Sequence, residues 1–492
     1  MTYGTETDAS SVPPQAPSRR CGHRLQVVPV AHAAPAFRPH ASSTGPKYPT
    51  ARDVRPEICS PADRSGHRAI RDKQYSALES LPGATRPACA APHTDRIAEV
   101  ADIVDPRLCA LIRSNVEAVS ARPDGLQTLS KAFYANLFAR HPETRQYFPA
   151  AMGEQRERIL HAVVHVVDRL SRPETVVPFL EQLGRDHRKY GIELWQYKAL
   201  TEALIDAVAQ AAGDDWTTEL DDAWHHALHL VATTMTEAAA AETGPAAWVG
   251  TVVEHRRPLD DVAVVRLRLD QPMAYEPGQY VSVQVPGRPR MWRYLSPATP
   301  PDADGAVEFH VRRVSGGWVS PYIVSHARVG ETWVLGSPIG ALGAETMRPG
   351  PGRPRPLLMI ASGTAIAPMR AQLMALARRP ATRAVTVFYA GRYPCDLYDL
   401  PTLWHLARTN PWLTVVPVTE SPTDPWWFTG PTDPPAGLSL LEGPVSRCVA
   451  EAGDWSGHDV QIAGSPAMIQ ATKFRLQATG VPADRIRHDP LY

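Results

Sequence analysis

The sequence predicts a multidomain chain in which an all-α domain is followed by an antiparallel β-barrel and then by an α/β domain with a parallel sheet. Apolar residues recur at helical spacing over residues 105–242. Short alternating segments separated by glycine and proline fill residues 246–347. Strand patterns alternate with helix patterns over residues 353–492. A chain of 492 residues is long enough for three such domains.

Residues 1–100 carry no sustained hydrophobic period. They are rich in Pro, Ala, Ser, Arg and His, and segments such as SSVPPQAPSRR bury too little apolar surface to offset chain entropy. We therefore predict a disordered extension. Its histidines are irregularly spaced, so a solvated tail is favoured over a metal site.

The composition argues against several classes of partner. The 51 basic and 51 acidic side chains balance, which gives no reason to expect nucleic acid or a charged membrane surface. Apolar stretches such as residues 356–361 are too short to span a membrane, and the first ten residues lack a signal-peptide pattern. The six cysteines lie far apart, which disfavours a zinc site or a disulfide framework. We expect a cytoplasmic protein and leave its oligomeric state open.

The first domain is predicted to be helical throughout. Apolar residues between 126 and 137 share one face of a helix that begins at Pro123-Asp124 and ends at His141-Pro142. Further helices are predicted over residues 154–170, 173–190, 193–212 and 216–241. Gly191 is placed to end the second of these.

The other two domains differ in how their strands are joined. The barrel strands are predicted in the segments VVEHRR, VAVVRLRLD, YVSVQV, VEFHVRRV and ETWVLG. In the last domain each of the strands LLMIAS, AVTVFYA, LTVVPV and DVQIAG is followed by a helical segment. That alternation is typical of a nucleotide-binding parallel sheet.

The helical region resembles the globin of bacterial flavohaemoglobins. The resemblance is carried, in the family's order, by FYANLFARHPETRQYF, EQRERI, LGRDHRKYG, QYKALTEAL and DAWHHAL. It implies haem b with His187 as the iron ligand, and a neutral imidazole is a suitable axial ligand. Without the resemblance, His187 would be one surface histidine among 18.

The resemblance also implies a network behind the iron ligand that makes the imidazole more anionic. Tyr197 matches the tyrosine of this network, and we favour Glu237 over Glu242 as its glutamate. The well-known members carry lysine just before the histidine, whereas this chain has Asp186. This charge reversal is expected to change the haem potential.

On the opposite, distal side the resemblance assigns oxygen contacts to Tyr134 and Gln155. A phenol and an amide both donate hydrogen bonds. Ile159 would form the apolar wall, and Phe148 would pack on the haem face. The alternatives are core aromatics for Tyr134 and Phe148 and a surface position for Gln155.

Two histidine pairs have the i, i+4 spacing of metal ligands, namely His161 with His165 and His225 with His229. They fall on helix sides away from Gln155 and His187. We interpret them as solvated faces.

The last 245 or so residues resemble the ferredoxin-reductase superfamily, in the branch of flavohaemoglobins and oxygenase reductases, which implies FAD. The flavin motif RxYS reads Arg293-Tyr294-Leu295-Ser296, so leucine occupies the tyrosine position and Tyr294 should face the other side of its strand. Arg293 keeps a role at the pyrophosphate. The further implied FAD contacts are Tyr280 of PGQY and Gly317, Val319 and Ser320 of the GGWVS loop. A plain hairpin turn is the alternative for that loop.

The nicotinamide motif GxGxxP is represented by Gly363, Thr364, Ala365, Ile366, Ala367 and Pro368. It follows a strand and opens a helix, as cofactor binding requires. Arg392 is placed to meet a ribose or 2′-phosphate, which leaves NADH and NADPH both open. The later CGP motif has lost its cysteine at Ala463. At the end of the chain Leu491 and Tyr492 match the segment that covers the flavin.

Together these resemblances imply an oxidoreductase that passes electrons from NADH or NADPH through FAD to haem iron. Flavin is needed between them because it exchanges both electron pairs and single electrons. The implied activity is nitric oxide dioxygenation to nitrate, with oxygen and nitric oxide as substrates. One alternative is a reductase for a hydroxy acid or quinone with the globin as electron outlet. The other is a haem gas sensor or oxygen-binding protein.

Overall fold

The computed structural model describes residues 105–347, 354–380, 383–430 and 438–489. The predicted extension over residues 1–100 and the predicted flavin cover at Leu491 and Tyr492 lie outside these residues. Within the described residues, no helix combines the length and the apolar character that crossing a membrane demands.

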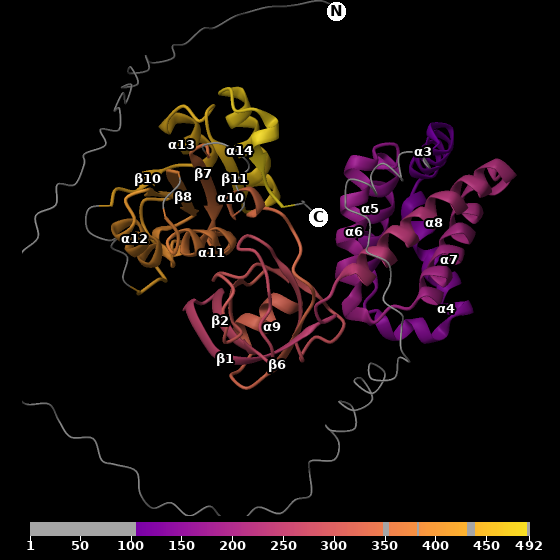
Figure 1. Cartoon of the computed structure of the whole chain (residues 1–492), viewed down its shortest axis with the longest axis horizontal. Helices are drawn as coiled ribbons and strands as arrows, with labels where there is room; N and C mark the ends of the chain where they lie inside the picture. The colour runs from indigo at the N-terminus through magenta and orange to yellow at the C-terminus, as the bar shows by residue number, and fades with distance from the viewer. Residues whose placement is uncertain (1–104, 348–353, 381–382, 431–437, 490–492) are drawn as a thin grey trace, which may run out of the picture. The chain divides into compact units, whose positions relative to one another are not determined.

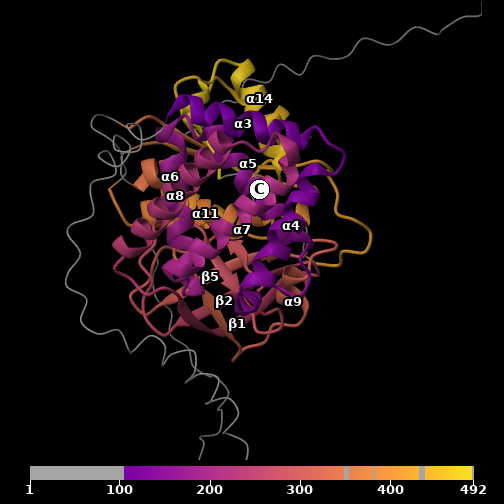
Figure 2. The ribbon, with the colours of Figure 1, turned by 90° about the vertical axis from the view of Figure 1, so that its right-hand side faces the viewer.

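Helices build the first domain, as predicted. They are α3 (Pro106–Ser120), α4 (Gly125–Arg140), α5 (Gly153–Arg169), α6 (Pro173–His187), α7 (Leu194–Ala212) and α8 (Thr218–Ala241), with short 3-10 turns at Pro142–Tyr147, Arg188–Tyr190 and Gly213–Asp215. Helix α6 packs on α8 and α4 packs on α7, and these pairs lie side by side in Figure 1 and Figure 2. Their apolar faces meet in one core that includes Phe133, Leu137, Leu180 and Trp224.

Helix α6 is positioned by residues at both its ends. Pro173 begins it, because proline suits the first turn of a helix. Gly184 faces α8, where a Cβ would collide with the backbone of Met235, so glycine permits the close packing of the two helices. The α-helix ends at His187 rather than at Tyr190, and a 3-10 turn leads to Gly191, whose φ of 61° needs glycine. His187 thus occupies a fixed helix end.

The second domain is an antiparallel sheet of six strands, in the order β4-β3-β6-β1-β2-β5. Its strands are β1 (Trp248–Leu259), β2 (Val262–Leu269), β3 (Val281–Gln284), β4 (Arg293–Leu295), β5 (Ala306–Arg312) and β6 (Thr332–Leu335). A bridge between Pro297 and Phe309 nearly closes the sheet. Helix α9 (Val319–Ser325) crosses the ring of strands in Figure 1 and adds Val319, Ile323 and Val324 to its core.

The third domain is a parallel sheet in the order β10-β9-β8-β7-β11-β12. Its strands are β7 (Leu357–Ser362), β8 (Val385–Gly391), β9 (Leu413–Thr419), β10 (Leu441–Glu442), β11 (Asp459–Ala463) and β12 (Ile486–Arg487), and its helices are α11 (Ala367–Leu376), α12 (Leu400–Thr409), α13 (Val445–Ala452) and α14 (Pro466–Ala478). The strand order reverses between β7 and β11. Open α/β sheets bind ligands at the carboxyl ends of strands at such a point. The predicted fold class is confirmed.

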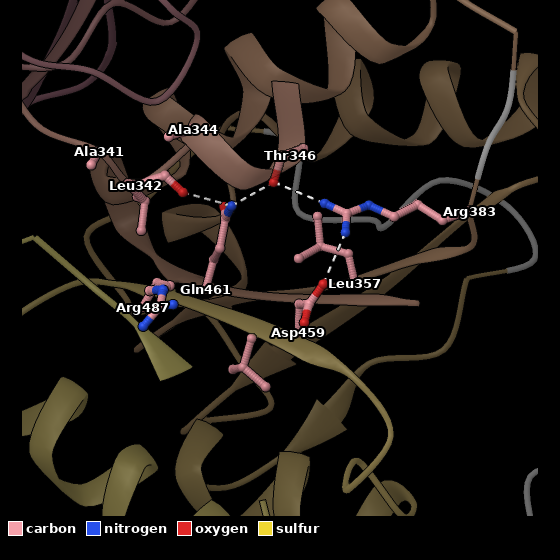
Figure 3. A pocket seen from close by; sticks show the side chains of 10 residues that line it. Ala341, Leu342, Ala344, Thr346, Leu357, Arg383, Asp459, Gln461 and Arg487 are labelled. Atoms are coloured by element: carbon pink, nitrogen blue, oxygen red, sulfur yellow. Dashed lines mark hydrogen bonds and ion pairs between the residues drawn. The ribbon is translucent and has the colours of Figure 1, made fainter. Parts of the chain in front are cut away.

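The opposite, amino-terminal edge of this sheet carries a cavity of about 230 Å³ beside the short helix α10 (Ala344–Met347). Figure 3 shows its polar side chains bonded to one another. Gln461 donates to the Leu342 carbonyl oxygen and to Thr346 Oγ1, both at 2.7 Å. Arg383 donates to Thr346 Oγ1 at 3.0 Å and to Asp459 at 3.1 Å. Leu342 and Thr346 lie in the segment that leads from the barrel to the parallel sheet, and these bonds attach that segment to the sheet.

Candidate functional site

His187 has the environment of a neutral imidazole. Its Nδ1 lies 2.7 Å from the carbonyl oxygen of Leu183, one turn earlier in α6. Burial lowers its pKa, and the smaller effect of the Asp186 charge raises it. If Nδ1 carries the proton and donates to Leu183, Nε2 keeps its lone pair for a metal.

A cavity of about 580 Å³ brings the three predicted proximal residues together. His187, Tyr197 and Glu237 all line it, from α6, α7 and α8 respectively. Burial raises the pKa of Tyr197 to about 12, so its phenol stays protonated and can donate a hydrogen bond. Glu237, which sequence reasoning favoured over Glu242, is therefore the glutamate on the same cavity as the imidazole.

The predicted distal residues lie in one aromatic cluster of the helical core. Tyr134 is buried between Phe133 and Phe148, with ring centroids 4.7 and 5.3 Å away. Burial raises its pKa to about 12, so the hydroxyl remains a donor. It donates at 3.4 Å to the backbone carbonyl oxygen of Gln155, not to the side-chain amide. Ile159 packs against the same core.

Sequence reasoning missed Tyr190, which has neighbours on both sides of this site. Its ring meets that of His187 edge to face at 5.6 Å. Burial raises its pKa, followed by the charge of Asp186, and Tyr134 is close enough to contribute to the same shift. Tyr190 follows the histidine at the end of α6, and no spacing rule marked it as a pocket residue.

The two histidine pairs lie elsewhere on the helices. His225 and His229 are exposed on α8, and His225 pairs with Asp221 at 3.2 Å. His161 is exposed on α5, while His165 packs on the ring of Phe179 at 4.3 Å. Among the described residues no cluster of three or more metal-binding side chains is found.

The flavin motif has the strand orientation that its sequence predicts. Leu295 packs toward the core of the barrel. Tyr294 faces away from it, and its hydroxyl donates to Asp186 Oδ2 at 3.0 Å. Tyr294 also meets the ring of Tyr280 at 5.1 Å, and Tyr280 accepts a hydrogen bond from Gln182 of α6 at 3.0 Å. Two predicted FAD residues therefore contact the helix that carries His187.

The remaining predicted FAD residues form a second group. The guanidinium of Arg293 pairs with the carboxylate of Glu154 at the start of α5. Ser296 follows directly after β4. The GGWVS segment leads into α9: Gly316 has a φ of 74°, Gly317 follows it, and Val319 is the first helical residue. Ser320 Oγ accepts a hydrogen bond from the backbone N–H of Val314 at 3.0 Å, which fixes this loop.

The predicted nicotinamide motif lies at the switch point of the parallel sheet. Residues 363–366 form a 3-10 turn at the carboxyl end of β7, and Pro368 lies in the first turn of α11. Gly363 has a φ of 53°. The AGSP segment follows β11, and its Gly464 approaches the end of β7 closely, since a Cβ there would lie 2.9 Å from Ser362 Oγ. Arg392 is exposed at the end of β8.

Arg312 is a second residue that sequence reasoning missed. Its guanidinium lies 3.9 Å from where a Cβ on Gly363 would be, and it pairs with Asp396 at 2.7 Å. Asp396 also accepts hydrogen bonds from the backbone N–H groups of Arg392 and Tyr393 at 3.0 Å. The predicted strand VEFHVRRV contains Arg312, but only the fold shows that this arginine lies beside the predicted nicotinamide turn.

Comparisons with known proteins match each domain in turn. A globin family matches residues 131–235, an oxidoreductase FAD-binding domain residues 250–343, and an oxidoreductase NAD-binding domain residues 359–473. A flavohemoprotein from Deinococcus radiodurans is 27% identical over 59% of this chain and 74% of its own length. The chain belongs to the flavohaemoglobin family. The cofactors predicted from the sequence, namely haem, FAD and a nicotinamide nucleotide, are those of this family.

A solved flavohemoglobin from Malassezia yamatoensis has the same fold, with a TM-score of 0.64 and 16% identity over 78% of this chain and 98% of its own. The reductase component of the naphthalene 1,2-dioxygenase system of Pseudomonas putida is 30% identical over 49% of this chain and 68% of its own length. The two C-terminal domains of this flavohaemoglobin belong to the same reductase family. Its architecture is that of an oxidoreductase that carries electrons from NADH or NADPH through FAD to haem.

Proposed function

We propose that this flavohaemoglobin converts nitric oxide and oxygen to nitrate, using NADH or NADPH as the electron donor. The observation that supports the proposal best is that Tyr190 neighbours residues of both predicted sides: its ring meets that of the half-buried His187 at 5.6 Å, and Tyr134 is close enough to influence its pKa. A histidine ligand on one side and a hydroxyl donor on the other are what a pocket for polar diatomic ligands requires.

The proximal residues fit a haem. When bound, haem supplies one-electron chemistry and a coordination position for oxygen. His187 would hold it through Nε2, with Nδ1 oriented by the Leu183 carbonyl. Tyr197 and Glu237 share the cavity beside this imidazole and would strengthen it as a ligand by hydrogen bonding.

The distal residues would act on oxygen. The Tyr134 hydroxyl would donate a hydrogen bond to oxygen, because burial keeps the phenol protonated across the physiological pH range. Gln155 lies beside that hydroxyl, and Ile159 and Phe148 would exclude water from it. A dry site strengthens the hydrogen bond that Tyr134 makes.

The reductase residues would orient the two nucleotides. Arg293 would meet the FAD pyrophosphate once Glu154 releases it, and Tyr280 and Ser296 would contact the same nucleotide, whereas Tyr294 faces Asp186 of the globin. The nicotinamide cofactor would lie on the Gly363 turn, with Arg312 and Arg392 beside it for phosphate or ribose contacts.

Nitrate formation with the holoenzyme tests this proposal. Nitric oxide, oxygen and NADH or NADPH are supplied, and nitric oxide loss, nitrate and nicotinamide oxidation are measured together. One nicotinamide should be oxidised for about two nitrates formed, since a hydride carries two electrons and each nitrate needs one. Nicotinamide oxidation that neither consumes nitric oxide nor yields nitrate would refute the dioxygenase function.

A second candidate is electron delivery to another acceptor. It is supported by the 30% identity with a dioxygenase reductase component and by the leucine at position 295 of the flavin motif. In that case ferricyanide or a quinone should be reduced rapidly while the haem stays ferric.

A further inference from the structure

Lys189 belongs to the globin domain, but its ammonium group is buried against the barrel, the predicted flavin domain. It belongs to the 3-10 turn between His187 and Gly191, and its side chain is 2% exposed. The ammonium lies 2.6 Å from Asp186 Oδ1 and donates to Ser282 Oγ of β3 at 2.8 Å. A lysine is rarely this buried unless its charge is paired.

Three aromatic rings surround the same ammonium. Its nitrogen lies 4.9 Å from the ring centre of Trp292, 5.0 Å from Tyr190 and 5.8 Å from Tyr294. Trp292 and Tyr294 belong to the barrel, at the beginning of β4. All three distances are within the range of a cation–π interaction, which is stronger where water is excluded.

Asp186 completes this site from the other side of His187. Its side chain is 6% exposed. Besides Lys189, its carboxylate accepts hydrogen bonds from Ser282 Oγ and the Tyr294 hydroxyl, both at 3.0 Å. A buried carboxylate with three donors has its charge compensated. The residues on both sides of the proposed iron ligand are thus bonded to the flavin domain.

Gly336, just after β6, lies against both Ser282 and the side chain of Lys189. A Cβ at Gly336 would collide with Ser282 Oγ and would lie 3.0 Å from Lys189 Cδ. Because Gly336 has no side chain, the barrel leaves room for the lysine stem at this point.

We infer that Lys189 and Asp186 are the docking element through which the flavin domain recognises the helix of the iron ligand. Ser282, Trp292 and Tyr294 form the receiving surface. Lys189 and Asp186 are positioning residues, since they act through His187 and the flavin motif on the electron transfer between the two cofactors. This inference rests on the proposed FAD-to-haem electron path.

The test uses the full-length holoenzyme with Lys189→Met and Lys189→Arg, and with Lys198→Met as the matched control because Lys198 is 78% exposed on α7. Three quantities are measured: NADH-driven haem reduction under carbon monoxide, ferricyanide reduction, and amide hydrogen exchange in β3 and β4. Both Lys189 variants should slow haem reduction by at least about tenfold and speed exchange in β3 and β4. Lys189→Met leaves the buried Asp186 carboxylate without its cation, and Lys189→Arg places a larger, planar group among the three aromatic rings. Ferricyanide reduction should stay within about twofold of wild type.

Gly336→Ala gives a second test from the barrel side without changing the globin. It should reproduce the slow haem reduction and the faster exchange with an unchanged haem spectrum, even if Lys189→Met folds poorly. Haem reduction and exchange that match Lys198→Met in all variants would overturn the docking element. Failure of the proposed electron path is distinguishable: wild-type haem would then stay ferric, while the exchange measurement would still report on docking.

Discussion

Glu154 and Arg293 form an ion pair between α5 of the globin and β4 of the barrel. Arg293 is the residue that the flavin motif assigns to the FAD pyrophosphate. A phosphate and a carboxylate compete for the same guanidinium N–H groups. In the proposed FAD complex, a phosphate would therefore compete with Glu154 for Arg293.

We predict that Glu154→Gln tightens FAD binding. The pair is partly exposed, so its loss is worth up to about 1 kcal/mol, which corresponds to a dissociation constant lowered by up to about fivefold. Fluorescence titration of the apoprotein with FAD measures this change. Glu157→Gln, one turn further along α5, is the control and should leave FAD affinity unchanged. Weaker FAD binding in Glu154→Gln would show that Glu154 supports the site rather than competing for it.

His187→Ala should purify with little haem. The imidazole is the proposed axial ligand, and the variant removes it while leaving Leu183 and Gly191 to define the end of α6. Haem content per polypeptide and the ferrous spectrum are the measurements. His229→Ala, on the exposed side of α8, should keep a full complement of haem. Normal haem content and spectrum in His187→Ala would end the ligand assignment.

Tyr134→Phe should speed oxygen dissociation while leaving carbon monoxide binding nearly unchanged. The substitution removes only the hydroxyl and keeps the ring packed against Phe133 and Phe148. A hydrogen bond to a charged acceptor is worth roughly 1.5–3 kcal/mol, so the off-rate should rise by roughly tenfold to a hundredfold. Stopped-flow displacement of oxygen measures it. An unchanged off-rate would mean that Tyr134 is only a core aromatic.

Glu308 of the barrel pairs with Arg370 of the α/β domain, and this contact should make the stability of the fold sensitive to acid. Burial alone would raise its pKa, but hydrogen bonds from His310 and Arg266 and the charge of Arg370 lower it to about 2. The ionised carboxylate therefore stabilises the fold above pH 4.5, and this stability is lost as pH falls from there toward 2. The full contribution is on the order of 3 kcal/mol.

Glu308→Gln should accordingly lower the urea midpoint at pH 7, and its difference from wild type should shrink as pH falls from 5 to 3. Intrinsic fluorescence during urea unfolding gives both midpoints. Glu420→Gln, an exposed carboxylate at the end of β9, should show no such pH-dependent difference. A gap that is constant with pH would mean that the charge of Glu308 contributes nothing.

Periodicity in the sequence was sufficient to predict the elements that bury their own apolar face. The helices over 126–137 and 193–212 and the strands LLMIAS and DVQIAG lie close to the predicted bounds. Strand β4 was expected only from the flavin motif and not from periodicity, because it has only three residues and is defined by pairing with β3 through a loop. The two-residue strands β10 and β12 likewise have no periodicity of their own.

In the candidate site, too, local features could be predicted from the sequence, whereas contacts between domains could not. The family resemblance was enough to nominate His187 and the Gly363 turn, because the motifs that carry it are local and each lies where one helix or strand ends. The bond between Asp186 and Tyr294 joins residues 108 positions apart in different domains, so no local pattern predicts it. Sequence reasoning interpreted Asp186 only as a charge change beside the haem ligand. The structure adds that its carboxylate is compensated by Lys189, Ser282 and Tyr294.

The central claim is that electrons pass from the nicotinamide through FAD to haem within this one chain. Anaerobic stopped-flow mixing of the wild-type holoenzyme with NADH or NADPH under carbon monoxide tests it most directly. We predict that the flavin spectrum bleaches and that the ferrous haem spectrum follows at a rate independent of protein concentration, since the transfer is intramolecular. A reduced flavin with haem that stays ferric, or haem reduction whose rate rises with protein concentration, would contradict the account.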